Sequence, residues 1–259
     1  MKYIAFVQAR VGSERFPNKV LTELWNGKSV LEVLIERLKL SKKLDDIIVA
    51  TTDEKEDLKI VELCKKLNIK CCNKGKKESA LESLFEAYSL LKLNYLIKDI
   101  VIIDITADCP FIDSYLLDEM IEDYEKGKYD YYSNVITRSF PIGFDIQIYN
   151  ENLLHKIYRF VSNPYHRVHT GINILNYLKE IQDVFNNIKV GNISAKDIYF
   201  HPDWRIVLDY QEDLILLKNI INYFNRIDFT YKEIIQYLTC NELLLEINRT
   251  CKQKIFGEK

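Results

Sequence analysis

Long hydrophobic runs are absent from this chain of 259 residues, and so are stretches rich in glycine, proline or serine that would mark a linker. No apolar segment approaches the roughly 20 residues that a membrane-spanning helix needs. The apolar run at residues 3–7 is also too short for the core of a secretory signal. Because 47% of the residues are hydrophobic, which is ample for a core, we expect a single cytoplasmic domain, residues 1–259, with no membrane partner.

A surplus of positive charge is missing as well. The formal net charge is −2, whereas a general nucleic-acid-binding domain is strongly basic, so nucleic acid is not an expected partner. The six cysteines include no Cys-x-x-Cys pair. Adjacent Cys71 and Cys72 lack the second clustered pair that a structural zinc site needs, and we therefore interpret the cysteines as reduced thiols.

Two glycine-rich phosphate motifs are also missing after the first apolar run. The absence of Gly-x-Gly-x-x-Gly disfavours a Rossmann dehydrogenase, and the absence of Gly-x-x-x-x-Gly-Lys-Ser/Thr disfavours a P-loop kinase. The run is followed instead by a loop that carries Arg10, Arg15 and Lys19. In an open α/β sheet, ligands bind at the carboxyl ends of the strands, and Arg and Lys together can hold several phosphate oxygens. The loop therefore indicates an anionic, phosphate-containing ligand, with a solvated basic loop as the alternative.

Segments of strand length alternate with segments of helical periodicity. The spacing of Ser29 and Glu32 predicts a capping box at the start of one helix, and Ser79 and Glu82 share that spacing. We predict an α/β fold of three layers, with a mostly parallel central sheet and residues 99–105 as its central strand. The other predicted strands are 3–7, 46–51, 69–72, 129–133, one within 137–149, and 204–208. The predicted helices start at 29, 52, 79, 114, 150 and 211, and two more lie within 228–247.

The segment 8–21 reads Gln-Ala-Arg-x-Gly-Ser-x-Arg-x-Pro-x-Lys-Val-Leu. It resembles the opening signature of the SpsF-type cytidylyltransferases, which are related to the CMP-sialic acid and CMP-Kdo synthetases. The chain departs from the usual signature at Val11, Glu14, Phe16 and Asn18. The resemblance implies a Rossmann-like nucleotide-diphospho-sugar transferase fold, with a nucleotide-binding part at about 1–113 and an acceptor-binding and closing part at about 114–259. It implies nucleotide contacts by Gln8, Ala9, Arg10, Gly12, Ser13 and Lys19, and a catalytic role for Arg10, Arg15 and Lys19.

Two acids at predicted strand ends become candidate metal ligands through the same resemblance. Asp108 follows the strand at 99–105, in a segment where the family usually has Gly in place of Ala107. Asp209 follows the predicted strand at 204–208. Related sugar-acid cytidylyltransferases have a magnesium-binding Asp at these points. Because magnesium takes one or two carboxylates and completes its shell with phosphate oxygens and water, we expect Mg2+ as the cofactor, held by Asp108 and Asp209.

Two further segments resemble the acceptor side of the family. Residues 141–145 keep its Pro, Gly and Asp, and Asn-Pro-Tyr-His-Arg-Val-His-Thr at 163–170 is similar to its Pro-Tyr-x-Arg-Glu-His-Val-Thr. This analogy gives four acceptor contacts: Arg138, Asp145, Arg167 and His169. A metal site at His166 and His169, which are three residues apart, and a structural histidine stay as alternatives.

These features predict an enzyme that transfers CMP from CTP to a small-molecule acceptor. An acceptor oxygen attacks the α-phosphorus and pyrophosphate leaves, while the protein positions the reactants and neutralises charge. The expected acceptor is an acidic sugar, or a phosphorylated or phosphonate-bearing molecule, used for surface polysaccharide or glycan synthesis. Whether the chain works as a monomer or a homodimer stays open.

Two alternatives to a working cytidylyltransferase remain. The first is a catalytically degenerate nucleotide-binding protein, because Glu14, Ala107 and Ser83, which stands where the family usually has Arg, depart from the family pattern. The second is a metal-dependent glycosyltransferase of related fold. Such enzymes use an Asp-x-Asp motif at a strand end, whereas Asp108 is followed by Cys109 and Pro110.

Overall fold

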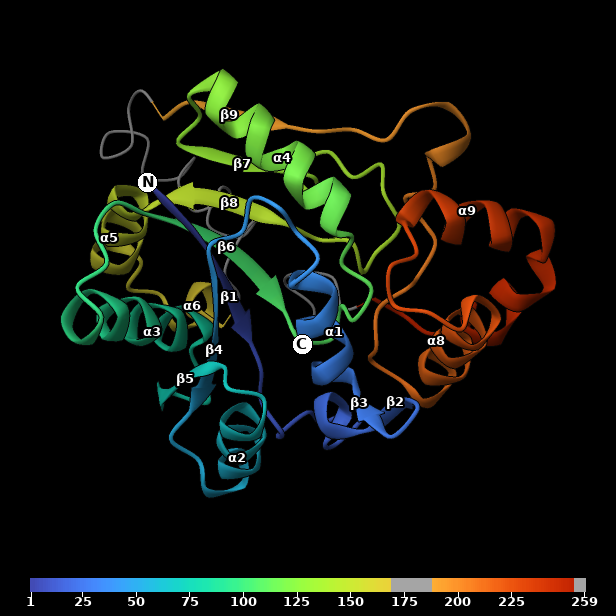
Figure 1. Ribbon diagram of the computed structural model, residues 1–259, viewed down its shortest axis with the longest axis horizontal. Helices are drawn as coiled ribbons and strands as arrows, with labels where there is room; N and C mark the ends of the chain where they lie inside the picture. The colour runs from blue at the N-terminus through green and yellow to red at the C-terminus, as the bar shows by residue number, and fades with distance from the viewer. Residues whose placement is uncertain (169–187, 254–259) are drawn as a thin grey trace.

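The structure is a computed structural model that describes residues 1–168 and 188–253 (Figure 1). In this part of the chain, seven strands form the central sheet. Their order is β5-β4-β1-β6-β8-β7-β9. The first four strands of this order are parallel, β8 is antiparallel to both β6 and β7, and β9 is parallel to β7. The predicted α/β fold with a mostly parallel sheet is therefore confirmed, and β6 is its central strand. The strands are β1 Lys2–Gln8, β4 Asp46–Thr52, β5 Lys70–Gly75, β6 Ile100–Thr106, β7 Tyr131–Ser133, β8 Gln147–Asn150 and β9 Val190–Asn192, with β2 Glu23–Trp25 and β3 Lys28–Ser29 as a separate hairpin.

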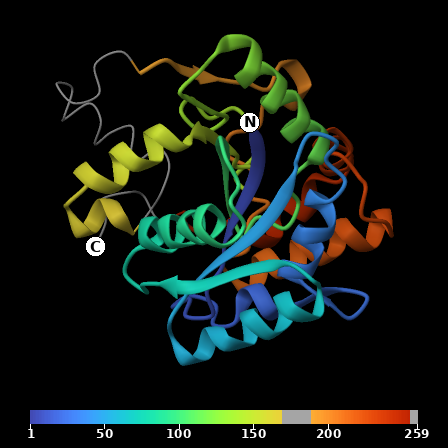
Figure 2. The same ribbon diagram turned by 60° about the vertical axis from the view of Figure 1, so that its left-hand side comes forward.

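Helices cover both faces of the sheet (Figures 1 and 2). Along β1, Ala5 and Val7 belong to the core beneath α1 and α4, while Ile4 and Phe6 belong to a second core beneath α3 and α5. Since both faces are covered, the strand is apolar at every position from 3 to 7. None of the described helices is long and apolar enough to cross a membrane. The helices are α1 Val30–Leu38, α2 Leu58–Lys66, α3 Ala80–Asn94, α4 Ser114–Gly127, α5 Glu151–Phe160, α6 Pro164–Arg167, α8 Gln211–Phe224 and α9 Tyr231–Cys240, with 3-10 turns at Lys19–Leu21, Lys55–Asp57, Asp197–Tyr199 and Glu242–Asn248.

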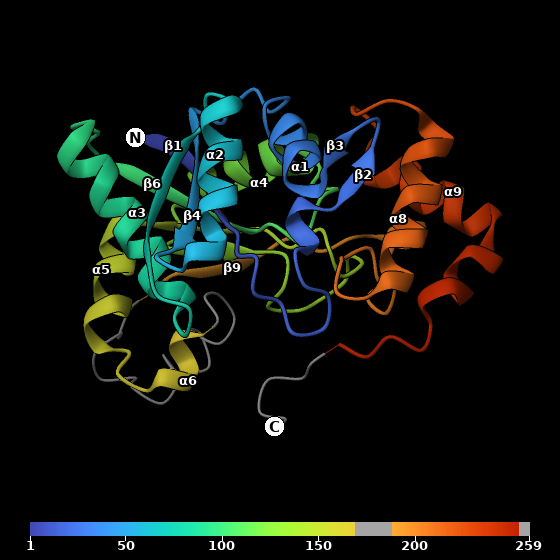
Figure 3. The same ribbon diagram turned by 90° about the horizontal axis from the view of Figure 1, so that it is seen from below.

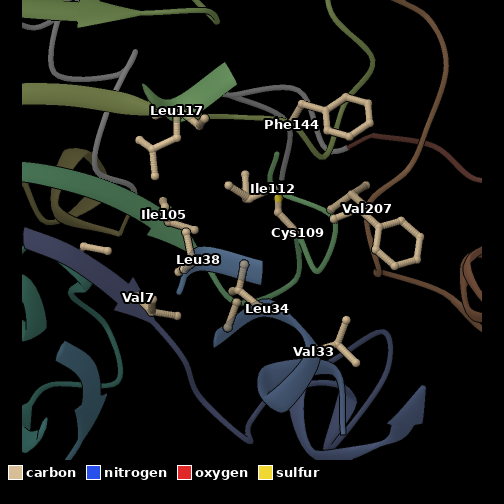
Figure 4. Packing of buried hydrophobic residues seen from close by; sticks show 14 of the residues in the cluster. Val7, Val33, Leu34, Leu38, Ile105, Cys109, Ile112, Leu117, Phe144 and Val207 are labelled. Atoms are coloured by element: carbon tan, nitrogen blue, oxygen red, sulfur yellow. The ribbon is translucent and has the colours of Figure 1, made fainter. Parts of the chain in front are cut away.

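Buried apolar side chains of α1 pack against the carboxyl ends of β1 and β6. Figure 4 shows Val7 and Ile105, near the ends of these two strands, beside Leu34 and Leu38 of α1. All four side chains are at most 1% exposed. The helices α8 and α9 lie at the opposite end of the molecule from α3 and α5, as Figure 3 shows. The loops that follow β1 and β6 therefore start from an anchored core and face the segment that leads into α8.

The helix predicted to begin at residue 52 begins later. Its first α-helical residue is Leu58, preceded by the 3-10 turn Lys55–Asp57. The hydroxyl of Thr52 donates to the Asp57 carboxylate, which also accepts the Thr52 backbone N–H. A local side-chain bond of this kind offers the backbone an alternative to helix, so the helix does not begin at Thr52.

The strand predicted at 204–208 does not form, so Asp209 is not a strand-end residue. Ile142 and Arg205 make an isolated bridge, in which Ile142 N donates to Trp204 O at 2.8 Å and Ile206 N donates to Ile142 O at 2.7 Å. Leu208 N then donates to Asp108 O, also at 2.8 Å. The segment divides its backbone hydrogen bonds between two loops, and no ladder can extend along it. The last of these bonds nevertheless brings the Asp209 segment against the Asp108 loop.

Gly143 is required for this arrangement. Its φ is +112°, and a Cβ atom added there would lie 2.3 Å from the carbonyl oxygen of Ile206. We expect Gly143→Ala to lower the free energy of unfolding by about 2–4 kcal/mol, because backbone strain and a backbone clash add together. The matched control is Gly27→Ala, since Gly27 has φ +75° but nothing within 4 Å of the added atom. Urea unfolding would contradict this account if both variants lost the same stability.

Candidate active site

The loop after β1 folds back on itself and is held from both sides. Ala9 N donates to Ala50 O at 3.0 Å, and Asn18 N donates to Val11 O at 3.1 Å. Val11 N donates to the Asp57 carboxylate at 2.7 Å. Asp57 is 2% exposed, and a buried carboxylate that accepts several hydrogen bonds is a strong anchor. A residue outside the sequence motif therefore fixes the shape of the basic loop.

Gly12 leaves open space at this loop. Among the described residues, a Cβ atom added at Gly12 would meet only Lys77 Cε, at 4.0 Å. Arg10 lies beside the same residue, since its guanidinium donates to Lys77 O at 2.8 Å. Packing within the described chain thus gives no reason for a glycine here, whereas close approach of a ligand to the backbone does.

The other residues predicted to contact the nucleotide shape the same loop. The side-chain amide of Gln8 donates to Asp104 of β6. Ala9 is buried, and Ser13 N donates to Val11 O at 2.8 Å. The structure thus places Gln8 at the end of β1 and Ala9 and Ser13 in the loop, while their contacts to a nucleotide stay a prediction.

Lys19 joins the loop to both predicted metal ligands. Its Nζ atom lies 2.7 Å from Asp108 Oδ2 and 2.9 Å from Asp209 Oδ1. Lys19 is 9% exposed as a residue. Because one buried ammonium group contacts both carboxylates, the structure brings together three residues that are far apart in the sequence.

Arg15 reaches the same point from the other side of the loop. Its Nη2 atom lies 2.7 Å from Asp209 Oδ1. Its Nη1 atom is 3.4 Å from the Tyr210 hydroxyl, and the guanidinium carbon lies 5.0 Å from the centroid of the Tyr210 ring. Arg15 and Lys19 therefore share one oxygen of Asp209.

Opposing effects set the pKa values at this cluster. Burial lowers the pKa of Lys19, but the carboxylates of Asp108 and Asp209 outweigh burial, so the pKa lies above its ordinary value. Burial raises the pKa of Asp108, but the contact with Lys19 outweighs it, so that pKa lies below its ordinary value. Each of these two shifts favours the charged form of its group.

A pH dependence of stability follows from these directions. The raised Lys19 pKa stabilises the fold until pH rises through it, and the lowered Asp108 pKa stabilises the fold until pH falls through it. We expect the difference in unfolding free energy between wild type and Lys19→Met to be constant from about pH 6 to 9 and to shrink below about pH 4. Urea unfolding across this range would measure it, and a steady slope between pH 6 and 9 would contradict the assignment.

The carboxylates fit a magnesium ion that shares its shell with a nucleotide. Asp108 Oδ2 and Asp209 Oδ1 already converge on one cationic group, Lys19 Nζ. Within residues 1–168 and 188–253, no group of three or more His, Cys, Asp or Glu side chains could hold a metal on its own. Hard oxygen donors in this number suit Mg2+, which completes its shell with phosphate oxygens and water.

The residues predicted to contact the acceptor fall in different places. Arg138 donates to both carboxylate oxygens of Asp145, at 2.7 Å each. Arg167 pairs with Glu82 of α3 at 2.7 Å and donates to Val161 O. Arg138 and Asp145, two of the four predicted acceptor contacts, thus form one ion pair. Arg167 connects α6 to α3 through its contact with Glu82. His169 lies outside the described residues.

Ser83 has a structural reason to be small. A Cβ atom added at Gly75 of β5 would lie 2.0 Å from Ser83 Oγ, so α3 and β5 approach closely at this point. Ser83 is 5% exposed. The close packing at this point leaves little room for a larger side chain, such as Arg, at position 83.

Sequence reasoning missed three residues of the cluster around Asp209. Arg205 Nη2 lies 3.4 Å from Asp209 Oδ2 and 3.2 Å from Asp213 Oδ2. Asn248 donates to Asp213 Oδ1 at 2.8 Å. Asp213 also accepts from the backbone of Tyr210 at the start of α8, as a capping acid does. The available signal was the even spacing of Arg205, Asp209 and Asp213.

The fold and the site together define a class of protein. A mostly parallel sheet carries a basic loop after its first strand and opposes it to two carboxylates, and the similar solved structures are nucleotidyltransferases of Rossmann-like fold. The family can then be stated. A family model described as cytidylyltransferase matches residues 4–235, and the chain belongs to this family of nucleotidyltransferase enzymes. The resemblance drawn from the sequence is confirmed.

Two similar proteins cover most of the chain, and a third covers about half of it. An uncharacterized protein of Methanocaldococcus jannaschii is 33% identical over 258 residues, 100% of this chain and 99% of that protein. The spore coat polysaccharide biosynthesis protein SpsF of Bacillus subtilis is 29% identical over 243 residues, 91% of this chain and 93% of that protein. An 8-amino-3,8-dideoxy-manno-octulosonate cytidylyltransferase of Shewanella frigidimarina is 32% identical over 126 residues, 49% of each chain.

Two solved structures are similar as well. A cytidylyltransferase from Leptospira borgpetersenii has a TM-score of 0.81 at 30% identity and covers 99% of this chain and 100% of that chain. A CMP:2-keto-3-deoxy-manno-octonic acid synthetase complexed with CTP has a TM-score of 0.59 at 14% identity, with coverage of 86% of this chain and 100% of that chain. The second likeness shows the fold alone.

Proposed function

We propose that this protein is a cytoplasmic enzyme that transfers CMP from CTP to an acidic sugar, with release of pyrophosphate, for polysaccharide or glycan synthesis. The observation that carries the proposal is the contact of Lys19 with both Asp108 and Asp209. It joins the basic loop to two carboxylates at one point, as binding of a metal–triphosphate requires. Family membership and the names of the SpsF and amino-Kdo relatives support the choice of CTP and an acidic sugar.

In this proposal the basic loop binds the triphosphate. Arg10 contacts the phosphates from its exposed position beside Lys77, and the space at Gly12 admits them close to the backbone. An acceptor hydroxyl oxygen forms a bond to the α-phosphorus and loses its proton to solvent, while the bond from that phosphorus to the oxygen bridging to the β-phosphate breaks and pyrophosphate leaves. Arg15 and Lys19 stabilise the charge that develops on the leaving pyrophosphate, which is the main contribution a protein makes to phosphoryl and nucleotidyl transfer.

Asp108 and Asp209 would hold Mg2+ in the same proposal. The ion supplies charge neutralisation at the phosphates and orients them for in-line attack. In the structure Lys19 lies between the two carboxylates, so Lys19 has to leave them to reach phosphate oxygens. In this exchange the two carboxylates would pair with Mg2+ and the ammonium group of Lys19 would pair with phosphate, so none of these charges would be left unpaired.

The acceptor site in this proposal is built around the Arg138–Asp145 pair. Because the pair is about 30% exposed, its remaining N–H donors and carboxylate lone pairs can meet the hydroxyl groups and the carboxylate of a sugar acid. Arg167 contributes from α6 where it contacts Glu82. A phosphorylated or phosphonate-bearing small molecule is the second acceptor class to test.

The test is pyrophosphate release with each of the four ribonucleoside triphosphates and Mg2+, against a panel of acidic sugars and small phosphates or phosphonates. We expect release only with CTP, Mg2+ and one acceptor class, and loss of release in Asp108→Asn and Asp209→Asn. CTP binding without release for any acceptor would favour the degenerate binding protein. Release with a different triphosphate would refute the assignment of the base.

Gly12 gives a sharper prediction about the loop. We expect Gly12→Ala to raise the KM for CTP about ten-fold, because a methyl group fills the space that the phosphates would enter. Stability should change by less than about 0.5 kcal/mol, since no described atom lies closer than 4.0 Å to the added carbon. Steady-state kinetics and thermal unfolding of the same preparation measure both quantities. An unchanged KM would place the phosphates elsewhere.

A further inference from the structure

We propose that Arg205 is a positioning residue for Asp209. Arg205 holds one oxygen of the Asp209 carboxylate so that the other oxygen faces Lys19 and the cation that accompanies a nucleotide. The inference rests on the proposed function, because it assigns Arg205 a task in that reaction. It extends the proposal to residues to which the sequence assigned no role in the site.

The two oxygens of Asp209 have different partners. Oδ1 contacts Arg15 at 2.7 Å and Lys19 at 2.9 Å, and Oδ2 contacts Arg205 at 3.4 Å. Asp209 is 3% exposed. A carboxylate whose far oxygen has lost its partner can rotate about its Cβ–Cγ bond, so the contact with Arg205 sets which oxygen points toward the loop.

Arg205 is itself held in place. Asp213 contacts its guanidinium through Oδ2 at 3.2 Å, and the same oxygen accepts the backbone N–H of Asp209 at 2.9 Å. Asn248 completes the arrangement, since its side-chain amide donates to Arg205 O at 3.0 Å and to Asp213 Oδ1 at 2.8 Å. Asp213 therefore fixes both the backbone of Asp209 and the group that holds its side chain. The C-terminal turn Glu242–Asn248 supports the site through this network.

The hydrogen bonding of Arg205 favours a positioning role over a role in folding alone. A guanidinium that serves one carboxylate usually makes two short parallel hydrogen bonds. Arg205 instead divides one nitrogen between two carboxylates, donates from Nη1 to Gln253, and leaves Nε buried with no hydrogen-bond partner in the described chain. Replacing a buried ion pair by apolar or neutral groups is often neutral for stability. Because the hydrogen bonding of Arg205 is incomplete, its buried position is better explained by orientation of the Asp209 carboxylate than by a contribution to folding.

The test variant must remove the charges of Arg205 and Asp213 together, so that neither is left buried without its partner. The double variant Arg205→Met and Asp213→Asn removes one charge of each sign, and the Asn amide oxygen can still accept the backbone N–H groups of Asp209 and Tyr210. The matched control is Arg226→Met and Glu233→Gln. It also breaks an Arg–carboxylate pair that involves a helix-capping acid, but on the half-exposed surface at α9.

Three readouts separate positioning from folding. Thermal unfolding checks that each variant is folded. Titration with Mn2+ in the presence of CTP, followed by electron paramagnetic resonance, measures cation binding without an acceptor. Pyrophosphate release measures kcat and KM. We expect the folded double variant to lose about 10–100-fold in Mn2+ affinity and in kcat, the usual effect of removing a residue that orients a ligand. The KM for CTP should change by less than about threefold, because the loop is intact. Arg205→Lys should recover part of kcat, and the control should match wild type.

Two outcomes would overturn the inference. One is a folded double variant with wild-type Mn2+ affinity and kcat, which leaves Arg205 a packing role. The other is Mn2+ binding that Asp209→Asn does not weaken, because Asp209 then holds no cation. Failure of the proposed function looks different, since wild type would release no pyrophosphate from any triphosphate while the Mn2+ titration would still compare the double variant with its control.

Discussion

Replacing Lys19 with methionine is expected to slow pyrophosphate release by about 10²–10³-fold, the usual effect of removing one preorganised group that stabilises developing charge. The loss should appear mainly in kcat, because Arg10 and Arg15 still bind the triphosphate. The same change should tighten binding of Mn2+ to the protein without nucleotide. Lys19 lies 2.7 Å from Asp108 and 2.9 Å from Asp209, and it competes with a metal ion for both carboxylates.

The two effects, slower pyrophosphate release and tighter Mn2+ binding, have opposite signs, so a general loss of structure in the variant could not produce both. The matched control is Lys28→Met, which removes a lysine that pairs with Glu36 at 2.7 Å on the surface. This control should leave both turnover and Mn2+ affinity unchanged, since an exposed pair contributes little. Weaker Mn2+ binding in Lys19→Met would mean that Lys19 organises the carboxylates and does not compete for them.

The sequence was enough to predict the parts of the fold with strong local signals. The apolar run at 3–7 became β1, and the spacing of Ser29 and Glu32 became a capping box at the start of α1. The run at 99–105 became the central strand of the sheet. These patterns succeed because burial on both faces and cap chemistry act over a few neighbouring residues.

Predictions failed where contacts between distant segments decide the backbone. The segment 204–208 has the composition of a strand, but its hydrogen bonds go to Ile142 and Asp108 in two different loops. A helix was expected to begin at Thr52, but the Thr52 hydroxyl donates to one oxygen of Asp57, whose other oxygen accepts from Val11 and anchors the basic loop. No local pattern contains the bonds of 204–208 or the bond between Val11 and Asp57, because these contacts join separate elements.

The candidate site shows the same division. Arg15, Lys19, Asp108 and Asp209 were predicted from motifs that resemble a family, and the structure brings all four together. Asp213 lies in the first turn of α8, where an acid is typical because it favours the helix dipole. It does cap α8, but it also pairs with the buried Arg205. A capping acid and an acid of a buried charge network cannot be told apart in the sequence.

The variants Asp108→Asn and Asp209→Asn should lose similar amounts of activity but different amounts of stability. We expect both Asp108→Asn and Asp209→Asn to lower pyrophosphate release by about 10²–10³-fold, because each removes one of the two carboxylates proposed to hold the metal. Asp209, however, is bracketed by Arg15, Lys19 and Arg205. Its neutralisation leaves Arg15 with no carboxylate partner in the described chain, and Lys19 and Arg205 with one each. We expect a loss of about 3–5 kcal/mol, the usual cost of breaking a buried pair, and a fall of roughly 10 °C in the unfolding midpoint.

Asp108→Asn should cost at most about 2 kcal/mol, because Lys19 keeps its contact with Asp209 and the amide oxygen of Asn can still accept a hydrogen bond. Thermal unfolding of both variants with no nucleotide or metal present compares them directly. Equal midpoints for the two variants would mean that the three cations around Asp209 find other partners when it is neutralised. A lower midpoint for Asp209→Asn alone, together with the matching loss of activity, would show that one carboxylate does two things: it balances the cations around it, and it holds the geometry that the reaction needs.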